Sequence, residues 1–311
     1  MGIAILSGIL ASISENKATP SPLTPLSQSG TSTPAEELPQ RLPTRFIACV
    51  KRPESAKKVE AVLSKYSTNV ELLVDDNLTG INQGDVILLC CKPQMFRDIL
   101  TAHGVRDALK GKLLISILAG VSVNQIEECL YGSISDVDPD QDGRCRLVRA
   151  MPNTAASVRE SMTVIANSTP ALPPHTAALV TWIFNRIGRV VRLPPSALDA
   201  STALCGSGPA FMALVLEAVA DGAVAMGLPR AEAQMMAAQT MRGTTGMVLN
   251  GEHPAILRDK VSTPGGCTIG GLLVLEEGRV RGTMARAVRE ATVVASQLGK
   301  GVIGVNGTRF L

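Results

Sequence analysis

The stretch from Lys260 to Gly271, KVSTPGGCTIGG, combines hydroxyl side chains, a Pro-Gly-Gly corner and the start of a helix. Gly265 and Gly266 allow a ligand to approach the backbone without obstruction by side chains. The N–H groups that open the following apolar run, Ile269 to Leu275, lack partners within a helix and point outward. The segment therefore has the features of a site for a small anion such as a carboxylate. The alternative is a tight turn between two helices that binds no ligand.

The composition excludes several classes of protein. The 311 residues, 45% of them hydrophobic, are enough for two domains with separate cores. The net charge of +3 and the absence of a basic block interleaved with aromatic residues argue against a nucleic-acid partner. We expect no membrane span, because the aliphatic runs are shorter than the roughly 20 residues that a bilayer requires. Seven cysteines without CxxC spacing indicate a reducing compartment, and we predict a cytoplasmic protein without a metal site.

The N-terminal segment has two parts of different character. Met1 to Ala11 is apolar, with no basic residues ahead of it and no A-x-A cleavage site behind it, so we predict the first turns of a buried helix rather than a signal peptide. Ser12 to Arg45 is rich in Ser, Thr and Pro and lacks the apolar residues needed for a packed core. We therefore predict a surface loop from 12 to 45.

Short aliphatic runs then alternate with helix-like stretches such as Glu54 to Lys65 and Met95 to Ala108. This alternation predicts a mostly parallel sheet with helices on its faces, the α/β architecture of Rossmann-type nucleotide-binding domains. The strand-like runs are Phe46 to Val50, Val70 to Val74, Val86 to Cys91, Leu113 to Ile117, Arg146 to Ala150 and Met162 to Ala166.

The second half of the chain reads as helices throughout. We place the domain boundary at Leu193-Pro194-Pro195, with a dinucleotide-binding domain at 1–193 and an all-α domain at 194–311. The first of these helices is apolar on nearly every side, which indicates burial in a large core or in a subunit interface. Because the helical domain is too small to enclose it alone, we predict an obligate oligomer. The expected helices are Pro209 to Met226, Arg230 to Asn250, His253 to Lys260, Thr268 to Glu277 and Arg279 to Leu298.

Several blocks of sequence, in order and at matching spacing, resemble the pyrroline-5-carboxylate reductase family. The resemblance runs from about Phe46 to Leu298. The family reduces the cyclic imine 1-pyrroline-5-carboxylate to L-proline with NADPH or NADH, the last step of proline biosynthesis. The blocks are DVIL with KPQ from Asp85, RAMPNT from Arg149, LCGSGPA from Leu204, ADG from Ala220, MGLPR from Met226, His253-Pro254, and Ser262 to Ile269.

The resemblance implies a set of cofactor-binding residues. They are Gly2, at what looks like the end of a glycine-rich turn, together with Arg52, Asn77, Lys92, Pro93, Ala119 and Lys260. Arg52 falls at a strand end where the ribose is read. An acidic residue there would accept from the 2′-hydroxyl of NAD, whereas Lys51-Arg52 suits a 2′-phosphate. This favours NADPH, with NADH as the alternative, unless these basic residues belong only to a solvated loop.

The resemblance also implies the residues that hold the substrate. They are Val261, Gly265, Gly266, Cys267 and Thr268, and Thr268 is the candidate catalytic residue, through a hydrogen bond between its hydroxyl and the ring nitrogen. Backbone N–H groups around Gly266 and Cys267 would hold the carboxylate. Reduction of a protonated imine needs no strong general acid, so the protein's part is to orient the reactants. The three histidines, His103, His175 and His253, are accordingly expected to be structural.

Two other interpretations of the function stay open. A hydroxyacid dehydrogenase of similar architecture needs a lysine acid or base after the nucleotide domain, and no lysine lies between Arg192 and Lys260. A truncated, catalytically inactive paralogue or isoform would act as an oligomeric scaffold. The reductase itself is expected to be a homodimer or a higher homo-oligomer.

The chain departs from the family at its N-terminus. A Rossmann domain normally begins with a strand and a G-x-G-x-x-G turn, and neither precedes Gly2 here. We expect the neighbouring strands to lose pairing partners, and we hypothesise a misassigned start codon or a truncated isoform.

A second stretch resembles a calcium-binding loop. Asp138, Asp140, Asp142 and Gly143 match its first positions, but position 12 is Arg149 in place of a bidentate glutamate. We therefore predict an acidic surface loop from Ser135 to Arg144.

Overall fold

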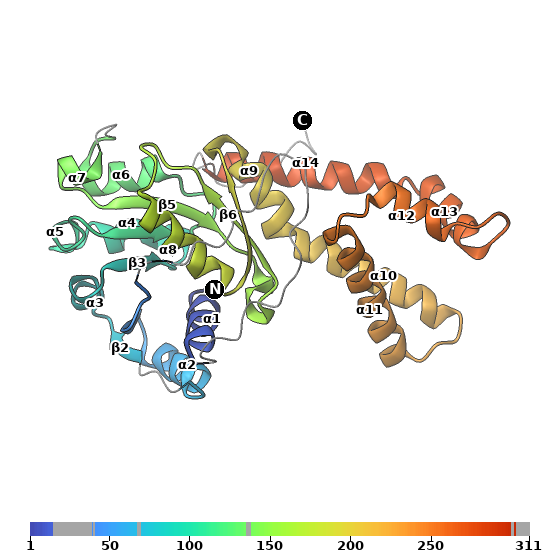
Figure 1. Ribbon diagram of the computed structural model, residues 1–311, viewed down its shortest axis with the longest axis horizontal. Coiled ribbons are helices and arrows are strands. Elements are labelled where there is room, and N and C mark those ends of the chain that lie inside the picture. Colours follow the sequence, from blue (N-terminus) through green and yellow to red (C-terminus); the bar gives the residue numbers. More distant parts are fainter. Residues whose placement is uncertain (15–38, 40, 67–69, 135–137, 300–301, 303–311) are drawn as a thin grey trace.

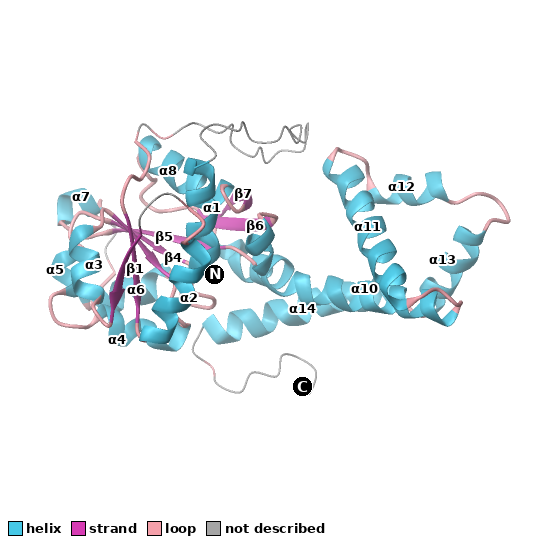
Figure 2. Cartoon of the chain, turned by 90° about the horizontal axis from the view of Figure 1, so that it is seen from below, coloured by secondary structure: helices cyan, strands magenta, loops and turns pink. Residues whose placement is uncertain are grey.

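The protein has a globular α/β part and a long helical arm (Figure 1). The computed structural model describes residues 1–14, 39, 41–66, 70–134, 138–299 and 302. Most of the predicted loop from 12 to 45 lies outside these residues. Of the described part, Ser12 to Ser14 belong to the first helix, contrary to the prediction, and 41–45 contain no helix or strand. The helical arm projects from the α/β part in both views (Figures 1 and 2).

The described residues of the α/β part form seven strands. All pair in parallel except β5 and β6, which are antiparallel. The six predicted strands are confirmed to within one or two residues, and β7 was not predicted. The strands are β1 (Phe46–Val50), β2 (Val70–Val74), β3 (Val86–Leu89), β4 (Leu113–Ser116), β5 (Arg146–Met151), β6 (Ser161–Ala166) and β7 (Gly188–Leu193).

The strands form two separate sheets. β1 pairs with β2, while the order β3-β4-β5-β6-β7 makes the second sheet. Within the described residues no strand joins β1 to β3, so the division falls where we expected pairing partners to be lost. Helix α1 (Gly2–Ser14), which the sequence predicted as a buried helix, packs against both sides of this division. Its Ile5 and Leu10 share one apolar core with Phe46 of β1 and Ile115 of β4.

Two helices flank β1 and β2, and four further helices pack around the larger sheet. The predicted single helix from Met95 to Ala108 is wrong: α4 (Phe96–Leu100) and α5 (Val105–Ala108) are separated by Gly104, whose φ of 80° ends any right-handed helix. The others are α2 (Pro53–Leu63), α3 (Asn77–Gln83), α6 (Val123–Tyr131) and α8 (Pro174–Asn185). Short 3₁₀ turns, η1 (Pro93–Met95) and η2 (Thr154–Val158), follow β3 and β5.

The acidic stretch after α6 is only partly a loop. A single helical turn, α7 (Pro139–Asp142), occupies its middle. Asp138 pairs with Arg146 at 2.8 Å and Asp142 pairs with Arg144 at 2.5 Å. In the described portion of the chain, no group of three metal-ligating side chains comes together.

The arm is built from helices, as predicted. After β7 come η3 (Pro195–Ala197), α9 (Leu198–Ser201) and a π-helical turn, η4 (Thr202–Ser207), which lead into α10. The C-terminal end of α14 returns to pack on α9 and η4. The arm helices are α10 (Gly208–Ala225), α11 (Arg230–Leu249), α12 (Pro254–Val261), α13 (Cys267–Glu277) and α14 (Val280–Gly299).

Few side chains of the arm are buried. In α10 only Ala220 is buried, and in α13 none is. Leu214 is 65% exposed and Met226 is 85% exposed. Helix α10 is therefore not buried in a core of its own chain. Of the two environments predicted for it, a large core or a subunit interface, only the interface is compatible with the structure.

The segment Pro195–Ala225 also has the length and hydropathy of a membrane span, contrary to our expectation from the sequence, and only 11% of its apolar window is buried. This property rests on length and composition alone. An apolar helix in a subunit interface has the same length and composition, so the finding does not distinguish the two.

Candidate functional site

The predicted cofactor residues of the α/β part follow successive strands. Arg52 lies two residues after β1 and Asn77 three residues after β2. Lys92 and Pro93 follow β3, and Ala119 follows β4. The carboxyl ends of parallel strands meet at one edge of each sheet, where α/β proteins bind nucleotides. Each of these five residues thus lies just beyond the carboxyl end of a parallel strand, Arg52 and Asn77 in the two-stranded sheet and the other three in the larger sheet.

Gly2 lies beside the same edge. It is the first residue of α1, and a Cβ built on it would lie 3.2 Å from Cβ of Cys90, just beyond β3. The N-terminal end of α1 therefore opens next to Lys92 and Pro93. Unpaired N–H groups at a helix N-terminus favour the negative charge of a phosphate.

Local structure fixes the first residues of the helices at this edge. Arg52 occupies the N-cap position of α2, with Pro53 as the first helical residue, and its side chain is exposed. Asp76 caps α3 by accepting from the backbone N–H of Thr79 at 3.0 Å. This hydrogen bond holds the pKa of the Asp76 carboxyl below its ordinary value. Asn77 is thereby set in the first turn of α3.

A cleft of about 1350 Å³ opens between this edge and the arm. Pro93 and Ala119 line one wall, and Arg286 and Glu290 of α14 line the opposite wall. Thr202 and Ser207 of the π-helical turn complete it. None of its lining residues belongs to α12 or α13, the helices that flank the predicted substrate segment.

The predicted substrate segment joins α12 to α13 in the arm. Gly265 has a φ of 69°, which a residue with a side chain rarely adopts. Gly266 donates its N–H to the carbonyl of Thr263 at 3.0 Å, so this N–H is not available for a carboxylate as we had expected. Helix α13 begins at Cys267 with no side-chain cap, which leaves the N–H groups of Cys267 and Thr268 as the donors.

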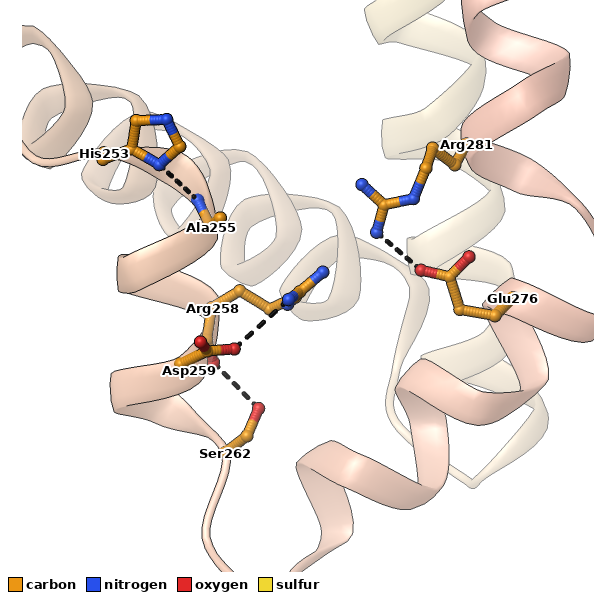
Figure 3. A network of polar contacts seen from close by, with 7 residues as sticks. All are labelled: His253, Ala255, Arg258, Asp259, Ser262, Glu276 and Arg281. Carbon is orange, nitrogen blue, oxygen red and sulfur yellow. Dashed lines mark hydrogen bonds and ion pairs between the residues drawn. The ribbon is translucent and has the colours of Figure 1, made fainter.

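Ion pairs and hydrogen bonds shape the arm around this segment (Figure 3). Arg281 of α14 pairs with Glu276 of α13 at 2.6 Å, and this hydrogen bond lowers the pKa of the Glu276 carboxyl. The hydroxyl of Ser262 donates to the carbonyl of Arg258 at 2.8 Å and closes the C-terminal end of α12. Lys260 pairs with Glu252 at 2.8 Å. These contacts lie on either side of the turn between α12 and α13.

One chain does not bring the two sets of predicted residues together. Val261 and Cys267 are exposed in the arm, and Lys260 is separated from the other predicted cofactor residues. In both views α12 and α13 lie at the end of the arm that is remote from the sheets (Figures 1 and 2).

Asn153 lies in the block RAMPNT, but the sequence gives no sign of its role. Its side-chain amide donates to the carbonyl of Cys205 at 3.0 Å. This bond ties the segment after β5 to the π-helical turn. Spacing alone gives no sign of this contact, because 52 residues separate the two partners.

Comparisons with known proteins agree with this arrangement. The profile of the family described as pyrroline-5-carboxylate reductase dimerisation matches residues 195–298. That of the NADP oxidoreductase coenzyme F420-dependent family matches residues 26–120. Together with the strand edge and its cleft, these matches define a dinucleotide-dependent oxidoreductase with a helical dimerisation domain.

Full-length relatives give the particular family. The pyrroline-5-carboxylate reductase of Lophium arboricola is 64% identical over 310 residues, covering 100% of this chain and 94% of its own. That of Schizosaccharomyces pombe is 43% identical and covers 96% of each chain. A solved pyrroline-5-carboxylate reductase from Coxiella burnetii superposes with a TM-score of 0.63 at 27% identity, covering 82% of this chain and 99% of its own. The chain belongs to the pyrroline-5-carboxylate reductase family.

Proposed function

We propose that the protein reduces 1-pyrroline-5-carboxylate to L-proline with NADPH, the last step of proline biosynthesis. Family membership carries this proposal, and two sites support it. One is formed by the carboxyl ends of the strands β1 to β4, which are followed by Arg52, Asn77, Lys92, Pro93 and Ala119. The other is the uncapped start of α13.

The residues at the strand edge fit a phosphorylated dinucleotide. Lys51 and Arg52 are exposed directly after β1, with the guanidinium free to pair a 2′-phosphate. Lys92 is exposed after β3, where it would meet the pyrophosphate. When bound, the cofactor supplies a hydride to the imine carbon. NADH remains the alternative cofactor, since the remaining residues of the edge do not read the 2′ position.

In this proposal the arm residues bind and orient the substrate. The N–H groups of Cys267 and Thr268 hold the carboxylate at the N-terminus of α13, and Gly265 keeps the approach clear. The hydroxyl of Thr268 hydrogen-bonds the ring nitrogen and fixes which face of the imine is presented. Val261 covers the ring.

We further propose that each active site is composite. The arm of one subunit presents Thr268 and Lys260 to the strand edge of its partner, because within one chain the helices that carry them, α13 and α12, lie at the end of the arm remote from the sheets. The exposed apolar side chains of α10 and α13 form the interface. The functional unit is then a homodimer, or a higher homo-oligomer built from it.

We take residues 1–193 as the dinucleotide-binding domain and residues 194–311 as the substrate and dimerisation domain. This proposal is supported by the end of β7 at Leu193 and the start of η3 at Pro195. A cytoplasmic location goes with the reducing conditions that seven cysteines suggest.

A catalytically inactive scaffold is the second candidate, and the divided sheet is the observation that favours it. Unpaired backbone groups at the inner edges of β1 and β3 weaken the part of the molecule that holds the cofactor. The experiment that decides is a turnover assay on the purified chain, following NADPH oxidation together with proline formation. A chain that dimerises and binds NADPH but yields no proline would be a scaffold.

Substitution of Thr268 tests the role of the arm. We expect Thr268→Ala to lower kcat by roughly tenfold or more, the usual worth of a hydrogen bond to a charged group. Thr101→Ala is the matched control, because the Thr101 hydroxyl donates only to the carbonyl of Arg97 on the surface of the α/β part. Equal activity of the two variants would remove Thr268 from the mechanism.

The cofactor preference tests Arg52. We expect Arg52→Ala to raise KM for NADPH by roughly tenfold and to leave KM for NADH unchanged, because only the 2′-phosphate pairs with the guanidinium. Equal changes for both cofactors would show that Arg52 does not read the 2′ position.

A further inference from the structure

A second cavity, of about 490 Å³, lies on the other side of Gly120 from the cleft. Its walls come from the first turn of α6, the strand β5, the segment after β6, and the adjoining ends of α9 and α14. Only Gly120 and Asp199 line both the cavity and the cleft. None of the residues that we assign to cofactor or substrate lines the cavity.

Arg149 of β5 is the unusual residue of this cavity. It is 9% exposed, and its Nε atom is buried without a hydrogen-bond partner. Among the described residues, no carboxylate lies within ion-pair distance of its guanidinium. Burial lowers the pKa of Arg149, and the negative charge of Asp199 partly offsets that effect. A buried cation with an unused donor is costly unless an anion satisfies it.

The first turn of α6 faces the same space. Ser122 caps this nine-residue helix by accepting from the N–H of Gln125 at 3.2 Å. The next two residues, Val123 and Asn124, line the cavity at the positive end of the helix dipole. Helix α6 and Arg149 therefore place two independent attractions for an anion in one cavity.

The cavity also carries negative charge. Asp199 of α9 lines it and lies close enough to Arg149 to act on its pKa. Glu127 of α6 and Arg146 of β5 line it as well, and Arg146 is already paired with Asp138. Two cationic and two anionic side chains thus border the space, which suits a ligand carrying both charges better than a plain anion.

We propose that this cavity binds a zwitterionic α-amino acid, with the ligand carboxylate on Arg149 and the start of α6 and the ligand ammonium group towards Asp199. The volume falls within the range of small-molecule sites. The site is separate from the start of α13 at which we place the substrate carboxylate.

Three matched probes test the proposal on the purified full chain by isothermal titration calorimetry. L-norvaline carries both charges, pentanoate lacks the ammonium group, and butylamine lacks the carboxylate. We expect norvaline to bind at least roughly tenfold more tightly than either of the others, because each removed charge loses a charge-assisted contact. Equal binding of pentanoate and norvaline would overturn the zwitterion, and no binding of norvaline would overturn the site.

Three variants locate the binding. Arg149→Met should weaken norvaline binding roughly tenfold or more. Asp199→Asn keeps the shape of the side chain and should abolish the preference for norvaline over pentanoate. Thr268→Ala should bind norvaline unchanged, and a loss there would place the ligand at the substrate site instead. Unaltered fluorescence of Trp182 in each variant verifies that the α/β part is folded.

Discussion

The α/β part and the arm differ in where their apolar side chains lie. In the α/β part Phe184 and Ile115 are 0% exposed, within one core that spans both sheets. In the arm Leu214 is 65% exposed and Leu273 is 58% exposed. Both regions carry many apolar residues, but they bury them in different ways. The apolar side chains of the α/β part pack against one another within one chain, whereas those of the arm need a second copy to cover them.

The proposed chemistry is divided along the same line. The strand edge of the α/β part holds the candidate cofactor residues, and the arm holds Thr268 and its neighbours. In the proposed composite site, activity requires the two regions to meet across subunits.

A charge on the apolar face of α10 tests most directly whether the arm forms the subunit interface. Leu214→Asp should abolish assembly and lower activity by roughly a hundredfold or more, because the charge would be desolvated in the interface. Light scattering gives the oligomeric state, and native fluorescence of Trp182, the only tryptophan, shows that the α/β part is intact.

Val158→Asp is the matched control for Leu214→Asp. Val158 is 69% exposed on the α/β part, so the charge should change neither assembly nor activity. An active, dimeric Leu214→Asp protein would show that α10 is not the interface.

Mixed dimers test whether the site is shared. Thr268→Ala impairs the arm and Lys92→Glu impairs the strand edge, so each homodimer should keep no more than roughly a tenth of wild-type activity. In an equimolar mixture about half of the dimers are mixed, and each of these has one intact site, which gives about a quarter of wild-type activity. The mixture is refolded together and assayed for NADPH oxidation.

A second mixture is the control for the first. Lys92→Glu combined with Ala119→Asp places both defects on the strand edge, so every composite site stays damaged and no activity should return. Recovery in neither mixture would mean that each chain completes its own site.

Core truncation separates the two regions by stability. Phe184→Ala should lower the free energy of unfolding of the α/β part by about 3 to 5 kcal/mol, the usual cost of removing a buried aromatic ring. Urea titration followed by Trp182 fluorescence measures it, because Trp182 lies in the same core. Val158→Ala should shift the transition by less than about 0.5 kcal/mol. A similar shift in both variants would contradict the assigned core.

A smaller effect is expected where α1 meets the large sheet. A Cβ added at Gly8 would lie 2.6 Å from the carbonyl oxygen of Arg186, too close for the backbone to accommodate without a shift. Gly8→Ala should therefore cost about 1 to 3 kcal/mol of stability, despite the better helix propensity of alanine. Gly222→Ala is the control, because a Cβ added at Gly222 has open space around it in the single chain. It should not shift the unfolding transition that Trp182 fluorescence reports. Gly111→Ala is unsuitable as a control because Gly111 has a positive φ.

The sequence was sufficient for most of the fold. Alternating aliphatic runs predicted six strands because parallel strands are buried on both faces. Gly227 and Gly251, both with positive φ, stand just after the ends of α10 and α11, where glycine commonly ends a helix. The run Met95 to Ala108 misled because helical composition hid the break at Gly104. β7 was missed because its Gly-Arg start and Arg192 dilute a short apolar run.

The candidate site was predicted less completely, since its contacts join distant parts of the chain. Motifs identified the residues of the strand edge and of the turn before α13. They gave no sign that the Gly266 N–H donates to the carbonyl of Thr263, or that the Asn153 side chain donates to the carbonyl of Cys205 in the π-helical turn. They also gave no sign that Arg149 is buried beside a cavity, because a strand arginine usually reaches solvent.

The division of the sheet bears on how a dinucleotide is held and released. Arg52 and Asn77 follow β1 and β2 of the small sheet, whereas Pro93 and Ala119 follow β3 and β4 of the larger sheet. A dinucleotide bound to all four residues would therefore contact both sheets and link them. The two-stranded unit, anchored mainly through helices, is then free to open as one cooperative unit while the larger sheet stays closed. Amide hydrogen exchange in β1 and β2 would slow on cofactor binding, and the lifetime of the bound cofactor would follow the rate at which this small unit opens.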